Sequence, residues 1–63
     1  MTLAIRDRDT GQVWSQPDAA GHRDILREAA RQLGIGAVAL AARIECGYVM
    51  NGRFIPTRKS EKW

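Results

Sequence analysis

The dipeptide Asn51-Gly52 constrains the fold of this chain more than any other feature of its sequence. Asn-Gly is a preferred centre for a two-residue type I′ turn, because such a turn needs a positive φ at both positions. The segment 43–50 before it is rich in strand formers, and the shorter segment 53–55 follows it. We therefore predict a hairpin over residues 43–56, with Met50 facing Arg53, Val49 facing Phe54 and Tyr48 facing Ile55.

A second hairpin is predicted near the N-terminus. Residues 2–6 and 12–15 have the alternation of short strands, and the stretch between them is rich in turn formers and ends in Gly11. Pro17 stops the second strand, because proline has no N–H to donate to a neighbouring strand. We expect this hairpin to occupy residues 2–16, with a loop of about five residues.

Apolar residues recur at helical spacing between the two hairpins. Asp18, directly after Pro17, is the predicted N-cap, and Gly34 is the predicted stop. Gly21 falls in the first turn of the helix predicted over 18–33, so a start at Gly21 or His22 is the alternative. The apolar stripe that predicts this amphipathic helix consists of Ile25, Leu26, Ala29, Ala30 and Leu33.

Two segments have weaker patterns. Alanine favours a helix in residues 35–42, whereas Ile35-Gly36-Ala37-Val38 suits an extended connection, and we expect a loop that leads into the next strand. Residues 57–63 form a tail in which Thr57 could cap one last helical turn. The predicted fold is therefore a small single α+β domain, 1–63, with the order β-β-α-β-β and one amphipathic helix packed on antiparallel hairpins.

The size and composition limit what stabilises such a domain. A chain of 63 residues buries only about 60% of the surface that its unfolded form exposes, and small domains often need disulfides, a metal or oligomerisation. Cys46 is the only cysteine, which excludes an intrachain disulfide and favours a cytosolic setting. A homodimer is therefore one of the possibilities. No apolar run approaches the length of a membrane span, so no membrane partner is expected.

Catalytic and metal-binding patterns are not recognisable. His22 is the only histidine, and Asp24 lies on a different face of the predicted helix. A role in local hydrogen bonding or packing is favoured for His22, and a buried, inert thiol is favoured for Cys46. We therefore predict no enzyme activity, no catalytic residues, no metal and no cofactor.

Basic residues supply the candidate binding surface. The chain has a formal charge of +3, and eight of its ten basic residues are arginines, which suit bidentate contacts with carboxylates or phosphates. Arg23, Arg27 and Arg31 form a line along the predicted helix, although Asp24 and Glu28 can pair with Arg27 and Arg31 and leave an ordinary solvated face. The candidate partner-binding residues are Arg23, Arg27, Arg31, Arg53, Tyr48 and Trp63. Trp63 suits either an interface anchor or a cover for one edge of the core.

Four segments of the chain resemble a group of short proteins encoded by phages and prophages. These proteins have a strand ending in Ser-x-Pro, a helix opening on His-x-x-Ile and a Gly-aromatic hairpin closing on Gly-Arg-Phe. The resemblance covers residues 12–58, but the hairpin is one residue shorter here and the usual following helix is cut to a stub. The matching segments are Gln12-Val13-Trp14-Ser15-Gln16-Pro17, His22-Arg23-Asp24-Ile25-Leu26, Glu45-Cys46-Gly47-Tyr48-Val49 and Gly52-Arg53-Phe54-Ile55.

The resemblance implies an origin in a mobile element and a cytoplasmic site of action in a bacterial host. It carries over no catalytic residue. By analogy of size and origin, it implies a stoichiometric inhibitor that occupies a surface of a host protein complex, such as an anti-CRISPR protein bound to a CRISPR effector. The alternative is a small regulator that binds nucleic acid through the basic helix face, although no zinc-finger, helix-turn-helix or RNA-recognition pattern is present.

Overall fold

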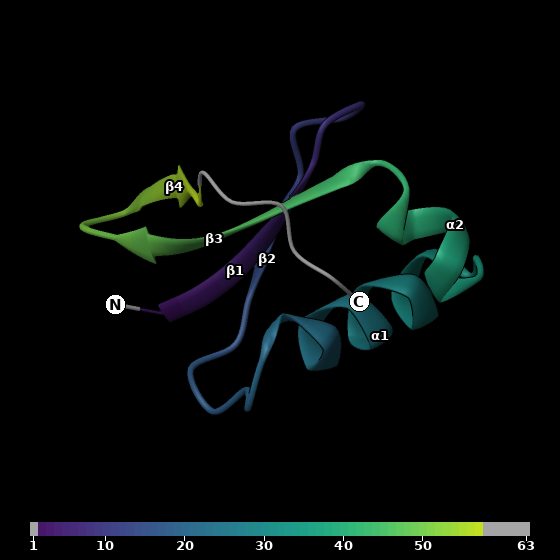
Figure 1. The fold of residues 1–63 in the computed structure, drawn as a ribbon, viewed down its shortest axis with the longest axis horizontal. Helices are drawn as coiled ribbons and strands as arrows, with labels where there is room; N and C mark the ends of the chain where they lie inside the picture. Colours follow the sequence, from purple (N-terminus) through teal and green to yellow (C-terminus); the bar gives the residue numbers. More distant parts are fainter. Residues whose placement is uncertain (1, 58–63) are drawn as a thin grey trace.

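The computed structural model describes residues 2–57, which form one four-stranded antiparallel sheet and two helices (Figure 1). This confirms the predicted α+β class. The sheet has the strand order β2-β1-β3-β4, so the two hairpins lie side by side through their first strands. The elements are β1 (Thr2–Asp7), β2 (Val13–Ser15), α1 (His22–Leu33), α2 (Ala37–Ala41), β3 (Ile44–Met50) and β4 (Arg53–Pro56).

The hairpin of β3 and β4 has the predicted register. Asn51 and Gly52 form its turn with φ values of 54° and 75°, as a type I′ turn requires. The pairs Met50↔Arg53, Val49↔Phe54 and Tyr48↔Ile55 are all confirmed.

The hairpin of β1 and β2 is also confirmed, with residues 8–12 as its five-residue loop. Gly11 adopts a φ of 81°, in the left-handed region, and its N–H donates to the carbonyl of Asp7 at 2.8 Å. The N–H of Asp7 in turn donates to the carbonyl of Gln12 at 2.8 Å, which closes the loop at its base. Glycine suits this loop because it adopts a positive φ without the steric penalty of a Cβ.

The pairing of β1 with β3 joins the two hairpins. These strands are antiparallel over six residue pairs, from Thr2↔Val49 to Asp7↔Ile44. No local turn connects them, because α1 and α2 lie between β2 and β3 in the chain. The sequence patterns predict both hairpins but not the pairing that merges them into one sheet.

Helix α1 begins at His22, the alternative start, and the predicted N-cap at Asp18 is wrong. Gly21 is the N-cap and has no side chain to offer, so the first turn takes its support elsewhere. The carboxylate of Asp24 accepts a hydrogen bond from the Ala20 N–H at 3.2 Å. At the other end Gly34 adopts the left-handed conformation with a φ of 70°, as predicted for the stop.

The segment 35–42, predicted to be a loop, contains the short helix α2. Gly36 is extended and serves as its N-cap, and the alanine-rich run that follows has high helix propensity. A helix of five residues is not stable alone, because nucleation is unfavourable and few hydrogen bonds follow it. The fully buried side chain of Leu40 anchors α2 to the core, and this tertiary contact decides the structure.

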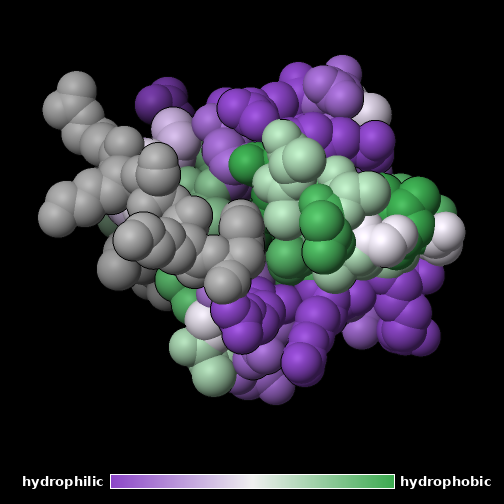
Figure 2. Space-filling view, turned by 45° about the vertical axis from the view of Figure 1, so that its right-hand side comes forward, coloured by the Kyte–Doolittle hydropathy of each residue, from purple (hydrophilic) through white to green (hydrophobic). Residues whose placement is uncertain are grey.

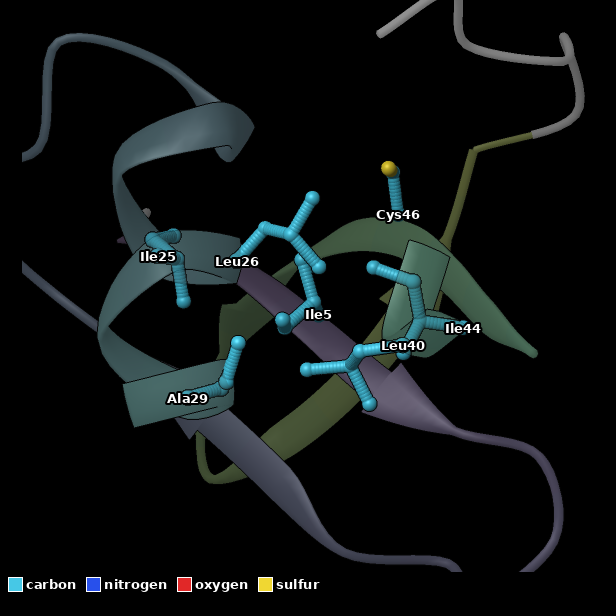
Figure 3. Packing of buried hydrophobic residues seen from close by; sticks show 8 residues of the cluster. Ile5, Ile25, Leu26, Ala29, Leu40, Ile44 and Cys46 are labelled. Atoms are coloured by element: carbon cyan, nitrogen blue, oxygen red, sulfur yellow. The ribbon is translucent and has the colours of Figure 1, made fainter. Parts of the chain in front are cut away.

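The core lies between the sheet and the two helices (Figure 3). Ile5 of β1 sits in its middle and is fully buried. Trp14 is half-buried and packs against this cluster. The predicted burial of Cys46 is confirmed. The buried members are Ile5, Ile25, Leu26, Ala29, Ala30, Leu40, Ile44 and Cys46.

On the opposite face of the sheet, residues of β4 pack closely against Gly47. A Cβ at this position would lie 2.2 Å from the Ile55 carbonyl oxygen and 2.8 Å from Cζ of Phe54, so only glycine fits. Arg6 lies beside this point, with its guanidinium 4.8 Å from the centroid of the Phe54 ring. The same arginine forms an ion pair with Glu45 on the neighbouring strand.

We expect Gly47→Ala to destabilise the protein by about 1–3 kcal/mol, as overpacking of a well-packed site does. The clash involves backbone atoms of β4, so a change of side-chain rotamer alone cannot relieve it. Chemical denaturation followed by circular dichroism measures the loss. An unchanged denaturation midpoint would show that the approach of β4 to Gly47 is wrong.

We expect Leu40→Ala to lower the free energy of unfolding by about 2–5 kcal/mol, the usual range for a buried leucine. Val38→Ala is the matched control, because Val38 lies in the same helix with 86% of its surface exposed and should change stability by less than about 0.5 kcal/mol. Equal losses in the two variants would contradict the anchoring of α2 by Leu40.

Candidate functional site

A shallow groove runs between α1 and α2 and has a volume of about 190 Å³. Its lining is almost entirely apolar, and two arginines of α1 border it. We call it the α1–α2 groove. The residues that line it are Arg23, Leu26, Arg27, Ala37, Val38 and Ala41.

An exposed apolar patch surrounds the groove. Val38 is the most exposed large apolar residue of the described part, at 86%, and Leu33 at the end of α1 and Ile35 in the connection to α2 are also exposed. Figure 2 shows this patch over α2, with hydrophilic side chains above and below it. Exposed apolar patches with polar rims are typical of interaction sites, whereas apolar residues scattered singly are ordinary. This patch therefore marks the groove as a candidate docking surface.

An arginine holds the C-terminal end of helix α2 in place. The guanidinium of Arg8, from the β1–β2 loop, donates to the carbonyls of Ala42 and Arg43 at 3.0 and 3.3 Å. These carbonyls lie at the helix end, where intrahelical donors run out. The loop between β1 and β2 thus positions the helix that forms one wall of the groove.

Asp7 is the one buried charged side chain among the described residues, with 1% of its surface exposed. Its carboxylate accepts hydrogen bonds from the Asp9 N–H at 2.8 Å and from Nε of Arg43 at 3.1 Å. Burial alone would raise the pKa of Asp7, but the hydrogen bonds from the Asp9 and Thr10 backbone and the charge of Arg43 outweigh it. The pKa of Asp7 therefore lies below its ordinary value of 3.8.

The three arginines predicted to form one line along α1 have different surroundings. Arg23 and Arg27 border the α1–α2 groove, and neither has an ion-pair partner within residues 2–57. Arg31 instead donates to the carboxylate of Glu28, one turn back, and that hydrogen bond lowers the pKa of Glu28. This confirms the expected pairing of Glu28 with Arg31, which leaves two arginines at the groove. Asp24, the other acid expected to pair, accepts from the Ala20 backbone.

The remaining predicted residues do not join this surface. Tyr48 and Arg53 lie on the β3–β4 hairpin, whose turn is at the opposite end of the molecule from α2 (Figure 1). Tyr48 is half-buried beside Leu3 and Ile55, and Arg53 is exposed next to the turn. Trp63 and the basic residues of the tail lie outside the described residues, so their part in the prediction stays open.

The two residues considered for chemistry have structural contacts. Nε2 of His22 lies 2.8 Å from the Gly47 carbonyl oxygen and donates to it, which ties the start of α1 to the centre of the sheet. Cys46 is buried in the core. Across residues 2–57 no group of three or more His, Cys, Asp and Glu side chains is placed to hold a metal ion. No helix in this part of the chain has the length and apolarity needed to cross a membrane.

Comparison with models of known families, with curated proteins and with solved structures found no match to this chain. The candidate site therefore rests on its geometry. Sequence reasoning found Arg23 and Arg27 but missed Ala37, Val38 and Ala41, because it predicted a loop where α2 lies. The alanine-rich run after Gly36 was the signal that could have identified them.

We expect the unfolding free energy to fall in acid through Asp7. A carboxyl whose pKa is lower in the folded state stabilises fully above its unfolded-state pKa and loses this contribution as pH falls through the folded-state value. For Asp7 the loss begins near pH 3.8, its ordinary pKa, and continues below it. Denaturation midpoints measured across this pH range should fall less steeply for Asp7→Asn than for the wild type.

The same variant should be less stable than the wild type at neutral pH, because Arg43 loses its charged partner. Arg43→Gln should flatten the acid-induced loss as well, since the Arg43 charge helps to lower the pKa of Asp7. A pH dependence in Asp7→Asn as steep as in the wild type would contradict this assignment.

Proposed function

We propose that this protein is a non-enzymatic inhibitor that occupies a surface of a host protein complex and docks through the α1–α2 groove. The observation that supports this most directly is the combination of an apolar groove with two arginines on its border. Val38, Leu33 and Ile35 are exposed to solvent in the described part of the chain. Burying one such side chain against a partner contributes about 1.5–3 kcal/mol.

The groove favours a particular partner chemistry. Its apolar floor suits one or two aliphatic or aromatic side chains, and the guanidinium groups of Arg23 and Arg27 suit carboxylates beside them. An acidic amphipathic helix presents both kinds of group on one face. The proposed partner surface is therefore an acidic helix with exposed apolar residues.

The resemblance to short phage and prophage proteins supports the biological setting of this proposal. In that setting the chain acts in the cytoplasm of a bacterial host, where it blocks a defence complex by binding to it. A CRISPR effector is the defence complex that we propose to test first, because anti-CRISPR proteins are the best-known inhibitors of this size. Occupying a surface requires no catalytic group, in keeping with the hydrogen-bonded His22 and the buried Cys46.

Nucleic acid is the less favoured partner. Binding to a phosphate backbone depends mainly on the number of basic groups that contact it. Here Glu28 neutralises Arg31, and the floor between the remaining two arginines is apolar. These features suit an acidic protein surface better than a row of phosphates.

We expect Arg27→Glu to abolish inhibition when the protein is expressed in bacteria that carry a defined CRISPR system. Reversing a charge at a close interfacial pair costs about 2 kcal/mol or more, so affinity should fall more than about tenfold. Phage plating efficiency on the expressing strains measures the effect, and purified effector tests direct binding.

Arg31→Glu is the matched control, because it makes the same change of charge on the same helix outside the groove. This variant should inhibit as the wild type does. Equal losses in the two variants, together with oligonucleotide binding that weakens steeply with salt, would favour nucleic acid instead. Unchanged CRISPR interference with the wild-type chain would overturn the anti-CRISPR version of the proposal.

A further inference from the structure

Strand β2 is an edge of the sheet, and no other strand of residues 2–57 pairs with its outer side. In antiparallel pairs the residues alternate between those that exchange hydrogen bonds with the neighbour and those whose backbone groups point away. The Gln12 carbonyl and the Gln16 N–H both form hydrogen bonds with β1. Trp14 lies two residues from each, so its backbone N–H and C=O also point toward β1. The N–H and C=O groups of Val13 and Ser15 therefore point outward, where the described sheet has no further strand.

A second groove, of about 540 Å³, lies between this edge and α1. Its volume falls within the roughly 300–1,000 Å³ of typical binding pockets. Two buried polar atoms of residues that line it, Nε1 of Trp14 and Oε1 of Gln16, have no hydrogen-bond partner among residues 2–57. Unsatisfied buried groups of this kind are rare in folded proteins and call for an explanation. The lining residues are Val13, Trp14, Ser15, Gln16, Ile25, Glu28 and Gln32.

We propose that the β2 edge is the interface of a symmetric homodimer, in which two copies of β2 pair antiparallel around a two-fold axis at Trp14. In this register Val13 of one copy faces Ser15 of the other, so the outward backbone groups of both copies form hydrogen bonds. The two Trp14 residues meet as the closer, non-hydrogen-bonded pair, and aromatic cross-strand pairs stabilise sheets. The result is one continuous eight-stranded sheet.

The side chains of this register are self-complementary. Gln12 of one copy lies directly opposite Gln16 of the other, on the face of the sheet that carries Trp14. Directly opposite side chains have Cβ atoms about 4.5–5.5 Å apart, within reach of an amide–amide hydrogen bond. The Gln12 amide of the second copy can then donate to the Gln16 Oε1, which has no hydrogen-bond partner in the described part of one copy.

The charged groups near this edge also favour a second copy of the chain as its partner. The side of α1 that lines the β2 groove carries Glu28 and Gln32, and Arg31 neutralises Glu28. Two copies can approach there without repulsion between like charges. The α1–α2 groove, by contrast, would bring Arg23 and Arg27 of each copy together. The dimer therefore uses a surface separate from the proposed partner site, and neither proposal depends on the other.

The molar mass in solution tests the dimer. Light scattering and sedimentation over a wide range of concentrations should give twice the chain mass of 7.0 kDa. Ser15→Pro should give the single-chain mass, because it removes an outward N–H while leaving the bonds between β1 and β2. Ser15→Thr keeps that N–H and should stay dimeric. Should Ser15→Pro not fold, Val13→Lys places a charge on the same edge with the same expected result.

Disulfide formation tests the register. In the proposed dimer residues 12 and 16 of opposite copies form a non-hydrogen-bonded pair, about 4.5 Å apart at Cα, which suits a disulfide. A mixture of Gln12→Cys and Gln16→Cys should form a cross-linked heterodimer on mild oxidation. Each variant alone should not, because its own cysteines are four residues apart along the strand, about 13 Å. The wild type, with Cys46 buried, is the control.

A single-chain mass at every concentration would overturn the proposal. The β2 edge would then be a site for pairing with an extended segment of another protein. A dimer that survives both Ser15→Pro and Val13→Lys overturns the choice of edge. Cross-linking of Gln12→Cys alone, at a rate equal to that of the mixture, overturns the register.

Discussion

The pairing of β1 with β3 is the contact on which the rest of the structure depends. Each hairpin alone is a two-stranded ribbon, and such ribbons are marginal in water. The six pairs from Thr2↔Val49 to Asp7↔Ile44 make one four-stranded sheet from them. That sheet aligns Ile5, Ile44 and Cys46 on a single face, and α1 and Leu40 of α2 cover this face. Without the pairing there is no surface large enough for the helices to pack against.

Charged groups at one end of this pairing connect the sheet to α2. Asp7 closes the end of β1 and holds Arg43, and Arg8 reaches the carbonyls where α2 ends. The buried carboxylate keeps its charge because backbone N–H groups and a guanidinium surround it. Burying a charge carries a desolvation cost that a charged partner and hydrogen bonds offset, whereas an unpaired buried charge leaves that cost uncompensated. The wall of the α1–α2 groove is thus positioned by the β1–β2 loop.

Helix α1 has two flanks of different character. The flank beside α2 carries Arg23 and Arg27 over an apolar floor, and the flank beside β2 carries Glu28 and Gln32. The first is the flank that we propose for an acidic partner, and its two arginines would repel a second copy of the same flank. The second is the flank that lies beside the proposed dimer edge. A domain of this size buries few residues in its own core, and the proposed dimer would extend the sheet across two copies. The flanks that carry Arg23 and Arg27 would remain exposed in that dimer.

The sequence by itself determined the features whose causes are local. Asn51-Gly52 selected the turn and with it the register of β3 and β4, the apolar stripe placed α1, and Gly34 ended it. The β1–β3 pairing, the helix α2 and the separation of Arg31 from Arg23 and Arg27 were decided by the tertiary structure. The pairing joins residues that are distant in the chain, and the five residues of α2 have no stable structure until Leu40 is buried. The α1–α2 groove depends on both, which is why the sequence indicated its arginines and could not indicate its floor.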